Sequence, residues 1–278
     1  MGTVSLAGLM EKYHAHIWPN QEYKQIKTDL SRFFDIVPDD LSKLTTKHIL
    51  QFVHKRRNQG VKDQTIRHNI NRLRSVLKHA AQMEDIKHPE GIDWPTLKTA
   101  DSRYRFLTPE EEIKLKSFLA PSDIEAMHFM IDTGMRPGEV FQTRAYNAEP
   151  FEWADVSKAK DGRKLVTLWR TKTGKSRTVP LTDRAADTLT ARQERGEPSP
   201  FAHEDYDAFK ANVCKAAREA GLEDVVVYTF RHTCATRLVQ RGADIRRVMV
   251  WMGHSNIETT LKYAKLVPED IYTLADLL

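Results

Sequence analysis

Apolar positions in the first ninety residues recur every three to four residues, which is the spacing of an amphipathic helix. Two such stripes open the chain: Leu6, Leu9, Met10, Tyr13 and Ile17 form the first, and Tyr23, Ile26, Leu30 and Phe33 form the second. We therefore expect two short helices that pack through these faces.

Two further helices are expected before residue 87. One begins at Thr46 and ends before Gly60, and its inward-facing positions are Ile49, Leu50 and Val53. The next begins near Asp63, and its apolar stripe is Ile66, Ile70, Leu73, Leu77 and Ala80. The basic residues of this last helix fall off the stripe, so we expect much of its positive charge to face outward.

Residues 87–106 interrupt the helical period and contain Pro89, Gly91 and Pro95, which is typical of a linker. Directly after them, Thr108 stands at an N-cap position, Pro109 at the first helical position and Glu111 three residues after the cap. The sequence thus predicts one domain over residues 1–86, a linker over 87–106 and a second domain over 107–278.

The second domain is expected to be mixed. Two strands are predicted over 164–169 and 176–181, and the sequence TKTGK forms the turn between them. Helices are predicted at about 122–132, 182–195, 204–219, 229–240, 243–252 and 256–265, with Thr229 as the cap of the fourth and a Ser255/Glu258 capping box on the last. The fold class is therefore mainly α with a small β-sheet, in an all-helical domain followed by an α+β domain.

Charge is unevenly distributed along the 278 residues, whose formal net charge is +5. The first hundred residues hold 16 Lys+Arg and 11 Asp+Glu, and the rest hold 27 of each. Between Lys55 and Lys78 stand eight basic residues and one acid, Asp63. Such a cluster favours a polyanion, because binding releases the condensed counterions of the nucleic acid. A solvated helix face is the alternative. The candidate DNA contacts are Lys55, Arg56, Arg67, Arg72, Arg74 and Lys78.

Composition excludes several other classes of protein. The chain has no apolar run long enough to cross a membrane and no secretory signal at its beginning. Its two cysteines, Cys214 and Cys234, make neither a disulfide framework nor a zinc cluster. We expect a reduced protein of the cytoplasm, either nucleoid-associated or in the cytoplasm of a host cell.

Six residues of the second domain are candidates for chemistry, two of them lysines that are alternatives for one role. Arg136 lies in a tight turn between two helices, where a salt bridge to Glu139 is the alternative use. Lys172 and Lys175 lie in the hairpin turn, where most lysines are simply solvated. Arg231 is expected in the first turn of a helix, where the helix dipole does not favour a cation. His254 lies in a turn, and Tyr263 follows it by nine residues, where a core role is the alternative.

These residue types suit a reaction at a phosphodiester. Two arginines can clamp the non-bridging oxygens, a histidine can donate to the same phosphate, and a lysine can protonate the departing 5′ oxygen. A tyrosine can attack the phosphorus and conserve the bond energy as a covalent ester. No carboxylate cluster for a metal and no phosphate-binding glycine loop is present, so neither a metal, ATP nor another cofactor is expected.

The sequence resembles the tyrosine recombinases, also called the phage integrase family, over essentially its whole length. The motifs that carry the resemblance are TGMRPGEV, TKTGKSRTVPL, FRHTCATRLVQRG and MGHSNIETTLKY. The resemblance implies a SAM-like core-binding domain and a catalytic domain in which Arg136 and Arg231 are the catalytic arginines. It also implies Lys172 as the hairpin lysine, with Lys175 as the alternative, His254 as the late histidine and Tyr263 as the nucleophile.

One position departs from the family pattern. The family usually has a histidine three residues before the second arginine, where this chain has Tyr228. A phenol can donate a hydrogen bond but is not a base near neutral pH. Activity could therefore be weakened, or the role could be hydrogen bonding alone. We do not expect His232 to take over, because it is rotated about 100° from Arg231 on the helix.

The sequence thus predicts a site-specific recombinase or integrase of a phage or other mobile element, working on double-stranded DNA through a 3′-phosphotyrosine. A catalytically weakened DNA-binding protein and a type IB topoisomerase are the alternatives. The resemblance implies a homotetramer on DNA, linked by exchange of C-terminal tails in which Leu274, Leu277 and Leu278 could dock, and a monomer is possible in free solution. Helical sequence begins within ten residues of Met1, so we expect no additional arm-binding domain, and no membrane partner is expected.

Overall fold

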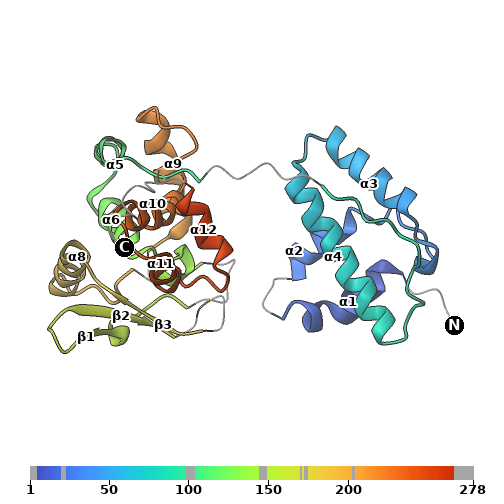
Figure 1. Cartoon of the computed structure of the whole chain (residues 1–278), viewed down its shortest axis with the longest axis horizontal. Helices are drawn as coiled ribbons and strands as arrows, with labels where there is room; N and C mark the ends of the chain where they lie inside the picture. Colours follow the sequence, from blue (N-terminus) through green and yellow to red (C-terminus); the bar gives the residue numbers. More distant parts are fainter. Residues whose placement is uncertain are drawn as a thin grey trace, which may run out of the picture. The chain divides into compact units, whose positions relative to one another are not determined.

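The computed structural model describes residues 5–19, 23–97, 104–143, 149–169, 171, 175–201 and 204–265. The chain divides into two compact units, Met1–Ser102 and Arg103–Leu278 (Figure 1). Each unit has a hydrophobic core of its own. The division falls within the interval 87–106 that the sequence assigns to a linker.

The first unit is helical in all its regular elements among the described residues. Its helices are α1 (Leu6–Ile17), α2 (Tyr23–Ser31), α3 (Thr46–Asn58) and α4 (Asp63–Gln82), with a short 3-10 helix at Leu41–Lys43. The long helix α4 packs against α1, α2 and α3. The predicted apolar stripe of α4 is buried along its whole length, which confirms that helix and its inward face.

One predicted core position of α3 is wrong. Leu50 is 50% exposed, whereas Ile49, Phe52 and Val53 are buried. The Phe52 ring stacks on Phe33 at 3.8 Å between centroids. Residue 50 lies 100° around the helix from Ile49, so the face that carries positions 49, 52 and 53 excludes it.

Part of the predicted linker belongs to the first unit. Leu97 is buried in its core, and the backbone N–H of Asp93 donates to the Thr46 hydroxyl at 2.8 Å. The Arg74 guanidinium lies 5.1 Å from the Trp94 ring centroid, which is a cation–π distance. Residues 92–97 therefore pack on the helices of this unit.

The second unit is mainly α with a small sheet, which confirms the predicted fold class. Its elements are α5 (Pro109–Lys116), α6 (Pro121–Thr133), α7 (Pro137–Val140), a 3-10 helix (Trp153–Asp155), β1 (Val156–Lys158), β2 (Lys164–Leu168), β3 (Arg177–Pro180), α8 (Asp183–Glu194), α9 (Tyr206–Glu219), α10 (Val227–Gln240), α11 (Ile245–Met252) and α12 (Glu258–Ala264). The helices α6 and α10 pack together at its centre, and α8, α9, α11 and α12 surround them (Figure 1).

The sheet has three antiparallel strands in the order β1-β2-β3. In β2, Val166 pairs with Val156 of β1 and with Val179 of β3. The predicted hairpin β2–β3 is confirmed. The strand β1 was not predicted, because it has only three residues and one apolar side chain, too few to show the alternation of a strand.

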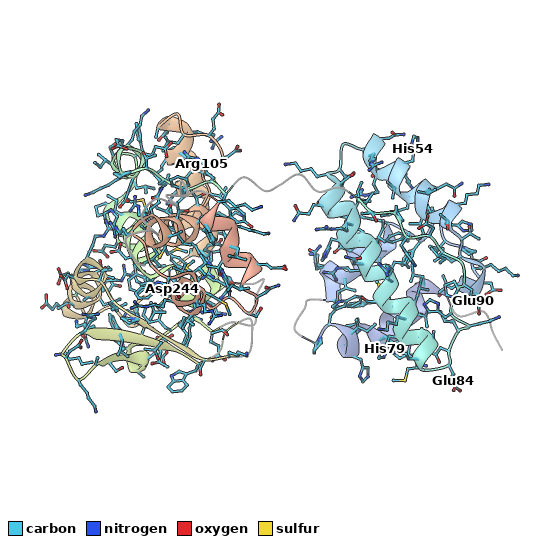
Figure 2. The ribbon with its side chains drawn as sticks, viewed as in Figure 1. His54, His79, Glu84, Glu90, Arg105 and Asp244 are labelled. Carbon is cyan, nitrogen blue, oxygen red and sulfur yellow. The ribbon has the colours of Figure 1, made fainter. Side chains whose placement is uncertain are left out.

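Capping residues define the start of α5 and the ends of α6 and α11. The predicted capping box of α5 is present, with Glu111 N–H donating to the Thr108 hydroxyl at 3.2 Å. The Arg105 guanidinium also binds Glu111 (Figure 2). Helices α6 and α11 end at Gly134 and Gly253, whose φ angles of 64° and 63° are left-handed. Glycine is favoured at such C-caps because a Cβ would be strained there.

Two predicted caps are wrong. Helix α10 begins at Val227, two residues before Thr229, and Thr229 instead accepts from the Val226 N–H at 3.0 Å through its side chain. Helix α12 begins at Glu258, and Asn256 rather than Ser255 accepts the Glu258 N–H, at 2.9 Å. At α11, the Asp244 carboxylate accepts from the N–H groups of Arg246 and Arg247 (Figure 2).

Candidate active site

Arg231 lies at the centre of the site, where the C-terminal ends of two helices meet. Its side chain is 1% exposed, and it donates to the carbonyl of Gly134 at the end of α6 and to the carbonyl of Met252 at the end of α11. A helix C-terminus favours a cation. Arg231 was expected in the first turn of its helix, where the dipole disfavours a cation. It is instead the fifth residue of α10, and its guanidinium is bound by the ends of two other helices.

Arg136 lies beside Arg231 because it donates to the next carbonyl along the chain. Its Nη2 contacts the Gly253 carbonyl at 3.0 Å, and its Nη1 contacts a Glu139 carboxylate oxygen at 3.0 Å. The backbone N–H of Arg136 also donates to Glu139, at 2.8 Å. The salt bridge to Glu139, which was the alternative use of Arg136, is therefore present, and its catalytic role stays a prediction. The N–H that was expected to attract an anion is already bound by Glu139.

A third arginine, which sequence reasoning missed, completes this cluster. Arg177 on β3 makes a bidentate contact with the Glu139 carboxylate, at 2.7 and 2.6 Å. A Cβ on Gly253 would come within 2.8 Å of the Arg177 guanidinium, so only glycine fits there without displacement of that arginine. Arg177 stands in the SRTVP segment that the resemblance uses, but nothing local in the sequence connects it to Glu139.

Glu139 is the single carboxylate in contact with these arginines among the described residues, and it is 1% exposed. Burial alone would raise the pKa of Glu139, but hydrogen bonds from Arg177 and the charges of Arg177 and Arg136 lower it to about 2. Glu139 is therefore ionised at neutral pH. Three guanidinium groups around one carboxylate leave an excess positive charge, which suits a phosphate.

His254 follows directly after the two carbonyls that bind the arginines. Its Nδ1 is 2.8 Å from the Thr260 hydroxyl, a contact that fixes the imidazole ring. Burial and the nearby arginines lower the pKa of His254 to about 3. The ring is therefore neutral at pH 7, and the bond at Nδ1 leaves Nε2 as the nitrogen available to a ligand.

Tyr263 is buried in the second unit, at 2% exposure, among Cys234, Val248 and Met252. Its ring lies parallel to His254 at 6.3 Å between centroids. Burial raises the pKa of the Tyr263 phenol above its ordinary value, and the charge of Arg231 lowers it in part. The core position that was the alternative for Tyr263 is therefore observed, and the same residue lies near His254.

His232 points away from Arg231, as the helical rotation predicts, but it still contacts a predicted site residue. Its Nδ1 lies 2.8 Å from the Tyr263 hydroxyl. Burial and the neighbouring Arg231 lower the pKa of His232 to about 4, so this imidazole is neutral at pH 7. The rotation of 100° turns His232 away from Arg231 but toward α12, which packs on that side of α10.

Tyr228, at the usual histidine position, is 41% exposed at the rim of the site. Its ring lies 5.4 Å from that of His232, in an edge-on arrangement. Val226 and Leu261 are also exposed, at 46% and 43%.

The hairpin lysine is placed only in part. Lys172 lies outside the described residues. Lys175 is exposed, and its carbonyl accepts from the Thr171 hydroxyl at 2.7 Å. The choice between Lys172 and Lys175 therefore stays a prediction. The tail residues Leu274, Leu277 and Leu278 also lie outside the described residues.

The basic residues of the 55–78 segment are exposed except at two positions. Arg67, Arg74, Lys78 and Lys55 are exposed, while Arg56 is half-buried and donates to Gln59. Arg72 contradicts the expectation of an outward face. It is 5% exposed and its Nε is 3.0 Å from Asp29, which also binds Asn69. A buried ion pair with Asp29 explains why a charged residue turns inward here.

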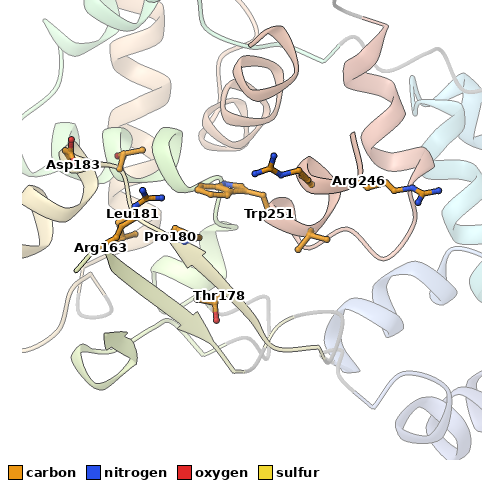
Figure 3. A pocket seen from close by; sticks show the side chains of 10 residues that line it. Arg163, Thr178, Pro180, Leu181, Asp183, Arg246 and Trp251 are labelled. Atoms are coloured by element: carbon orange, nitrogen blue, oxygen red, sulfur yellow. The ribbon is translucent and has the colours of Figure 1, made fainter. Parts of the chain in front are cut away.

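A groove of about 840 Å³ opens on another face of the second unit (Figure 3). Trp251 reaches from α11 toward Pro180 and Leu181 at the end of β3. The basic residues on its wall are Arg163, Arg246 and Arg247, and Val250 is 69% exposed. The groove is therefore largely apolar, and its charged lining residues are these three arginines and Asp183.

Among the described residues, no group of three or more His, Cys, Asp or Glu side chains has the arrangement of a metal site. No helix in the same ranges combines the length and apolarity that a bilayer crossing requires.

The model of the phage integrase family matches residues 105–269, which is more than half of the chain and contains every residue of the site. The chain belongs to the phage integrase family. The integrase of Escherichia phage P2 is 28% identical over 230 residues, which cover 82% of this chain and 63% of the phage protein. A tyrosine recombinase of Pseudothermotoga lettingae is 28% identical over 253 residues, covering 85% of this chain and 82% of that protein.

The chain matches only part of the length of two phage integrases. It spans 63% of the phage P2 integrase and 51% of the Haemophilus phage HP1 integrase. Solved structures of the same fold include a lambda integrase dimer bound to a core site, with a TM-score of 0.72 at 16% identity over 94% of this chain and 77% of that one. The Tn1549 transposon integrase has a TM-score of 0.71 at 16% identity, over 94% and 95%.

Proposed function

We propose that this integrase-family chain is a site-specific tyrosine recombinase that breaks and rejoins DNA through a 3′-phosphotyrosine. One observation carries the proposal. Arg231 and Arg136 bind the consecutive carbonyls of Met252 and Gly253 at the end of α11, His254 is the next residue, and Tyr263 lies beside it. These groups supply charge for a phosphate, a fixed imidazole and a nucleophile within one site.

Each residue has a distinct role in the proposed reaction. Arg136 and Arg231 hold the non-bridging oxygens of the scissile phosphate, and His254 donates to it through Nε2. The Tyr263 oxygen attacks the phosphorus, and the 5′ oxygen leaves with a proton from Lys172. Tyr228 donates a hydrogen bond to the phosphate from the rim. Glu139 holds Arg136 and Arg177 in place through the contacts described above.

Double-stranded DNA is the proposed substrate, and a phage or transposon the proposed element. Support comes from the relatives: the lambda integrase dimer is bound to a core site, and the Tn1549 integrase is bound to circular-intermediate DNA. We propose residues 1–86 as the core-binding domain and residues 107–278 as the catalytic domain. Action on a chromosome or on phage DNA places the protein in the cytoplasm of a cell.

The test of this function is cleavage of a nicked suicide duplex in excess EDTA and without ATP. We expect a covalent protein–DNA adduct that depends on the target sequence, because the arginines supply the charge that a metal would supply. The rate of adduct formation is compared with the rate in added magnesium, and only the cleavage step is scored, since magnesium also affects DNA folding.

Each other outcome of this assay would indicate a different function for the chain. An adduct without sequence preference identifies a type IB topoisomerase. Normal DNA binding with no adduct identifies a binding protein with a weakened site, for which the Tyr228 substitution would be the reason. Cleavage that stops in chelator and returns with magnesium contradicts the metal-free mechanism and indicates a nuclease.

The exposed part of the basic segment is proposed to contact DNA phosphates. Replacement of Arg67, Arg74 and Lys78 by Ala should weaken binding and reduce the slope of log K against log salt by about 1 for each true contact. Arg72 is left out because its loss would strand the buried Asp29 and destabilise the unit.

A matched triple variant makes this test specific. Lys24, Lys27 and Lys43 are exposed basic residues of the same unit outside α3 and α4. Their replacement by Ala removes the same charge and should leave the salt slope unchanged. Equal slopes for the two triple variants would show that the 55–78 segment is ordinary solvated surface.

We further propose that protomers form a tetramer on DNA by exchange of the C-terminal segment 266–278. This segment contains three acids, no basic residue and several leucines, which complements the positive and apolar lining of the groove in Figure 3. Sedimentation of DNA complexes formed with and without residues 266–278 tests this: the shortened chain should cleave a half-site but form no tetramer. A tetramer of the shortened chain would exclude the exchange.

A further inference from the structure

We propose that His232 is the general base that accepts the proton of Tyr263 when the phenol attacks the scissile phosphorus. This inference rests on the proposed function and adds a proton acceptor to it. Sequence reasoning gave no role to His232, and the usual candidate position is occupied by Tyr228.

The geometry places a hydrogen bond along the path that the proton would take. His232 Nδ1 and the Tyr263 hydroxyl oxygen are 2.8 Å apart, within the range for direct transfer. Tyr104 packs edge-on against His232 at 4.8 Å between centroids and contacts the Tyr263 ring at 5.2 Å. These three rings therefore support one another, and the two hydrogen-bonded atoms have little freedom to separate.

The other described groups near the nucleophile are less suited to take the proton. His254 uses Nδ1 for Thr260, and its ring lies parallel to that of Tyr263 at 6.3 Å between centroids. The phenol of Tyr228 is not a base at neutral pH. Arginine has no acceptor atom.

The protonation states agree with this direction of transfer. His232 is neutral at pH 7, because burial and Arg231 lower its pKa to about 4, and Tyr263 is a phenol. A scissile phosphate adds negative charge beside the imidazole and so favours its protonated form. The titratable and charged groups near His232 are Arg231 and Tyr228 on α10, Tyr263 on α12, His254 in the turn before α12, and Tyr104 before α5. Lys262 contacts the Tyr104 ring.

The proposed step balances in both directions. The Tyr263 proton moves to His232 Nδ1 while the bond from the tyrosine oxygen to phosphorus forms and the bond from phosphorus to the 5′ oxygen breaks. The 5′ oxygen takes its proton from the hairpin lysine. In rejoining, the His232 imidazolium returns its proton to the departing tyrosine oxygen, so the same residue acts as the acid.

The test is His232→Asn in single-turnover adduct formation between pH 6 and 9. The asparagine amide oxygen can still accept a hydrogen bond from the phenol but cannot take its proton. Wild-type protein should show a flat profile, because His232 stays unprotonated across this range. The variant should be slower by about 10²- to 10⁴-fold at pH 7 and should gain about tenfold per pH unit, because it depends on phenolate.

Two controls separate this role from a structural one. Thr260→Val removes the bond that fixes His254, so it should lower the rate and leave the profile flat. A substrate with a 5′-thiolate leaving group needs no proton on departure, so it should not rescue His232→Asn if His232 acts on the nucleophile. Unfolding temperature and DNA affinity of His232→Asn, both expected near the wild-type values, confirm that the variant is folded.

Several results would overturn the proposal. A flat profile for His232→Asn, or a rate within threefold of wild type, removes His232 as the base. Rescue by the thiolate substrate makes it an acid for the leaving group instead. Absence of any adduct from wild-type protein at every pH refutes the proposed function itself, which is a different outcome.

Discussion

Tyr263→Phe should bind target DNA with wild-type affinity and form no covalent complex. The substitution removes one oxygen and leaves the buried ring in contact with Cys234, Val248 and Met252. The free energy of unfolding should change by only about 1 kcal/mol, the usual value of one hydrogen bond, because the lost partner is the His232 ring nitrogen. Without a nucleophilic oxygen no phosphotyrosine can form.

The measurement is adduct formation on a suicide substrate, resolved by denaturing gel and mapped by mass spectrometry to a peptide. Tyr228→Phe is the matched control, since Tyr228 is another tyrosine at the site and is far more exposed. It should react more slowly but still form the adduct at Tyr263. An adduct on Tyr263→Phe protein would assign the nucleophile to another residue.

Local sequence signals were sufficient to predict most of the helices. The α4 stripe, the capping box at Thr108 and the glycines that end α6 and α11 all follow from rules that act within one or two turns. Arg136 and His254 could be placed from the same signals, because they lie two residues after Gly134 and one residue after Gly253. The motif resemblance then supplied their roles, which remain proposals.

Long-range pairing explains where the predictions were wrong. Arg72 is buried because Asp29, 43 residues earlier in the chain, is buried opposite it. A helical period can identify the apolar stripe but cannot show that an acid from another helix accepts a charge within it. Arg177 was missed for the same reason, since Glu139 lies 38 residues away.

His232 illustrates a different limit. Helical rotation correctly predicted that His232 and Arg231 point in different directions, but a site need not lie on one side of a helix. Helix α10 contacts α6 and α11 as well as α12. Arg231 faces the ends of α6 and α11, while His232 faces Tyr263 on α12. The site surrounds α10, and only the tertiary arrangement shows this.

Arg136→Lys and Arg231→Lys should each lower single-turnover cleavage by about 10²-fold or more. Lysine keeps the charge but loses the planar fork that contacts two acceptors at once. Arg231 spans the carbonyls of Gly134 and Met252, and Arg136 spans Glu139 and Gly253. An ammonium group cannot reproduce either pair of contacts and also clamp a phosphate. The guide for the magnitude is the cost of removing one donor that stabilises a transition-state oxyanion.

The two substitutions should differ in their effect on stability. Arg231 is 1% exposed, so the lysine variant leaves a buried helix-end carbonyl without its donor and should lower the unfolding temperature. Arg136, with a side chain 15% exposed, should unfold closer to wild type. Arg192→Lys provides the control for stability. Arg192 is also buried and binds Glu125 and Glu204, but neither partner belongs to the site.

The cleavage rate therefore separates the two site arginines from Arg192, whereas stability alone does not. Arg192→Lys should lose stability and keep its cleavage rate, measured at a temperature where the protein is folded. Arg136→Lys should show the reverse, with near-normal unfolding and slow cleavage. A change of less than threefold in cleavage by Arg136→Lys or Arg231→Lys would show that the residue does not hold the scissile phosphate. The cluster around Glu139 would then be a structural ion-pair network, and the phosphate would have to bind elsewhere.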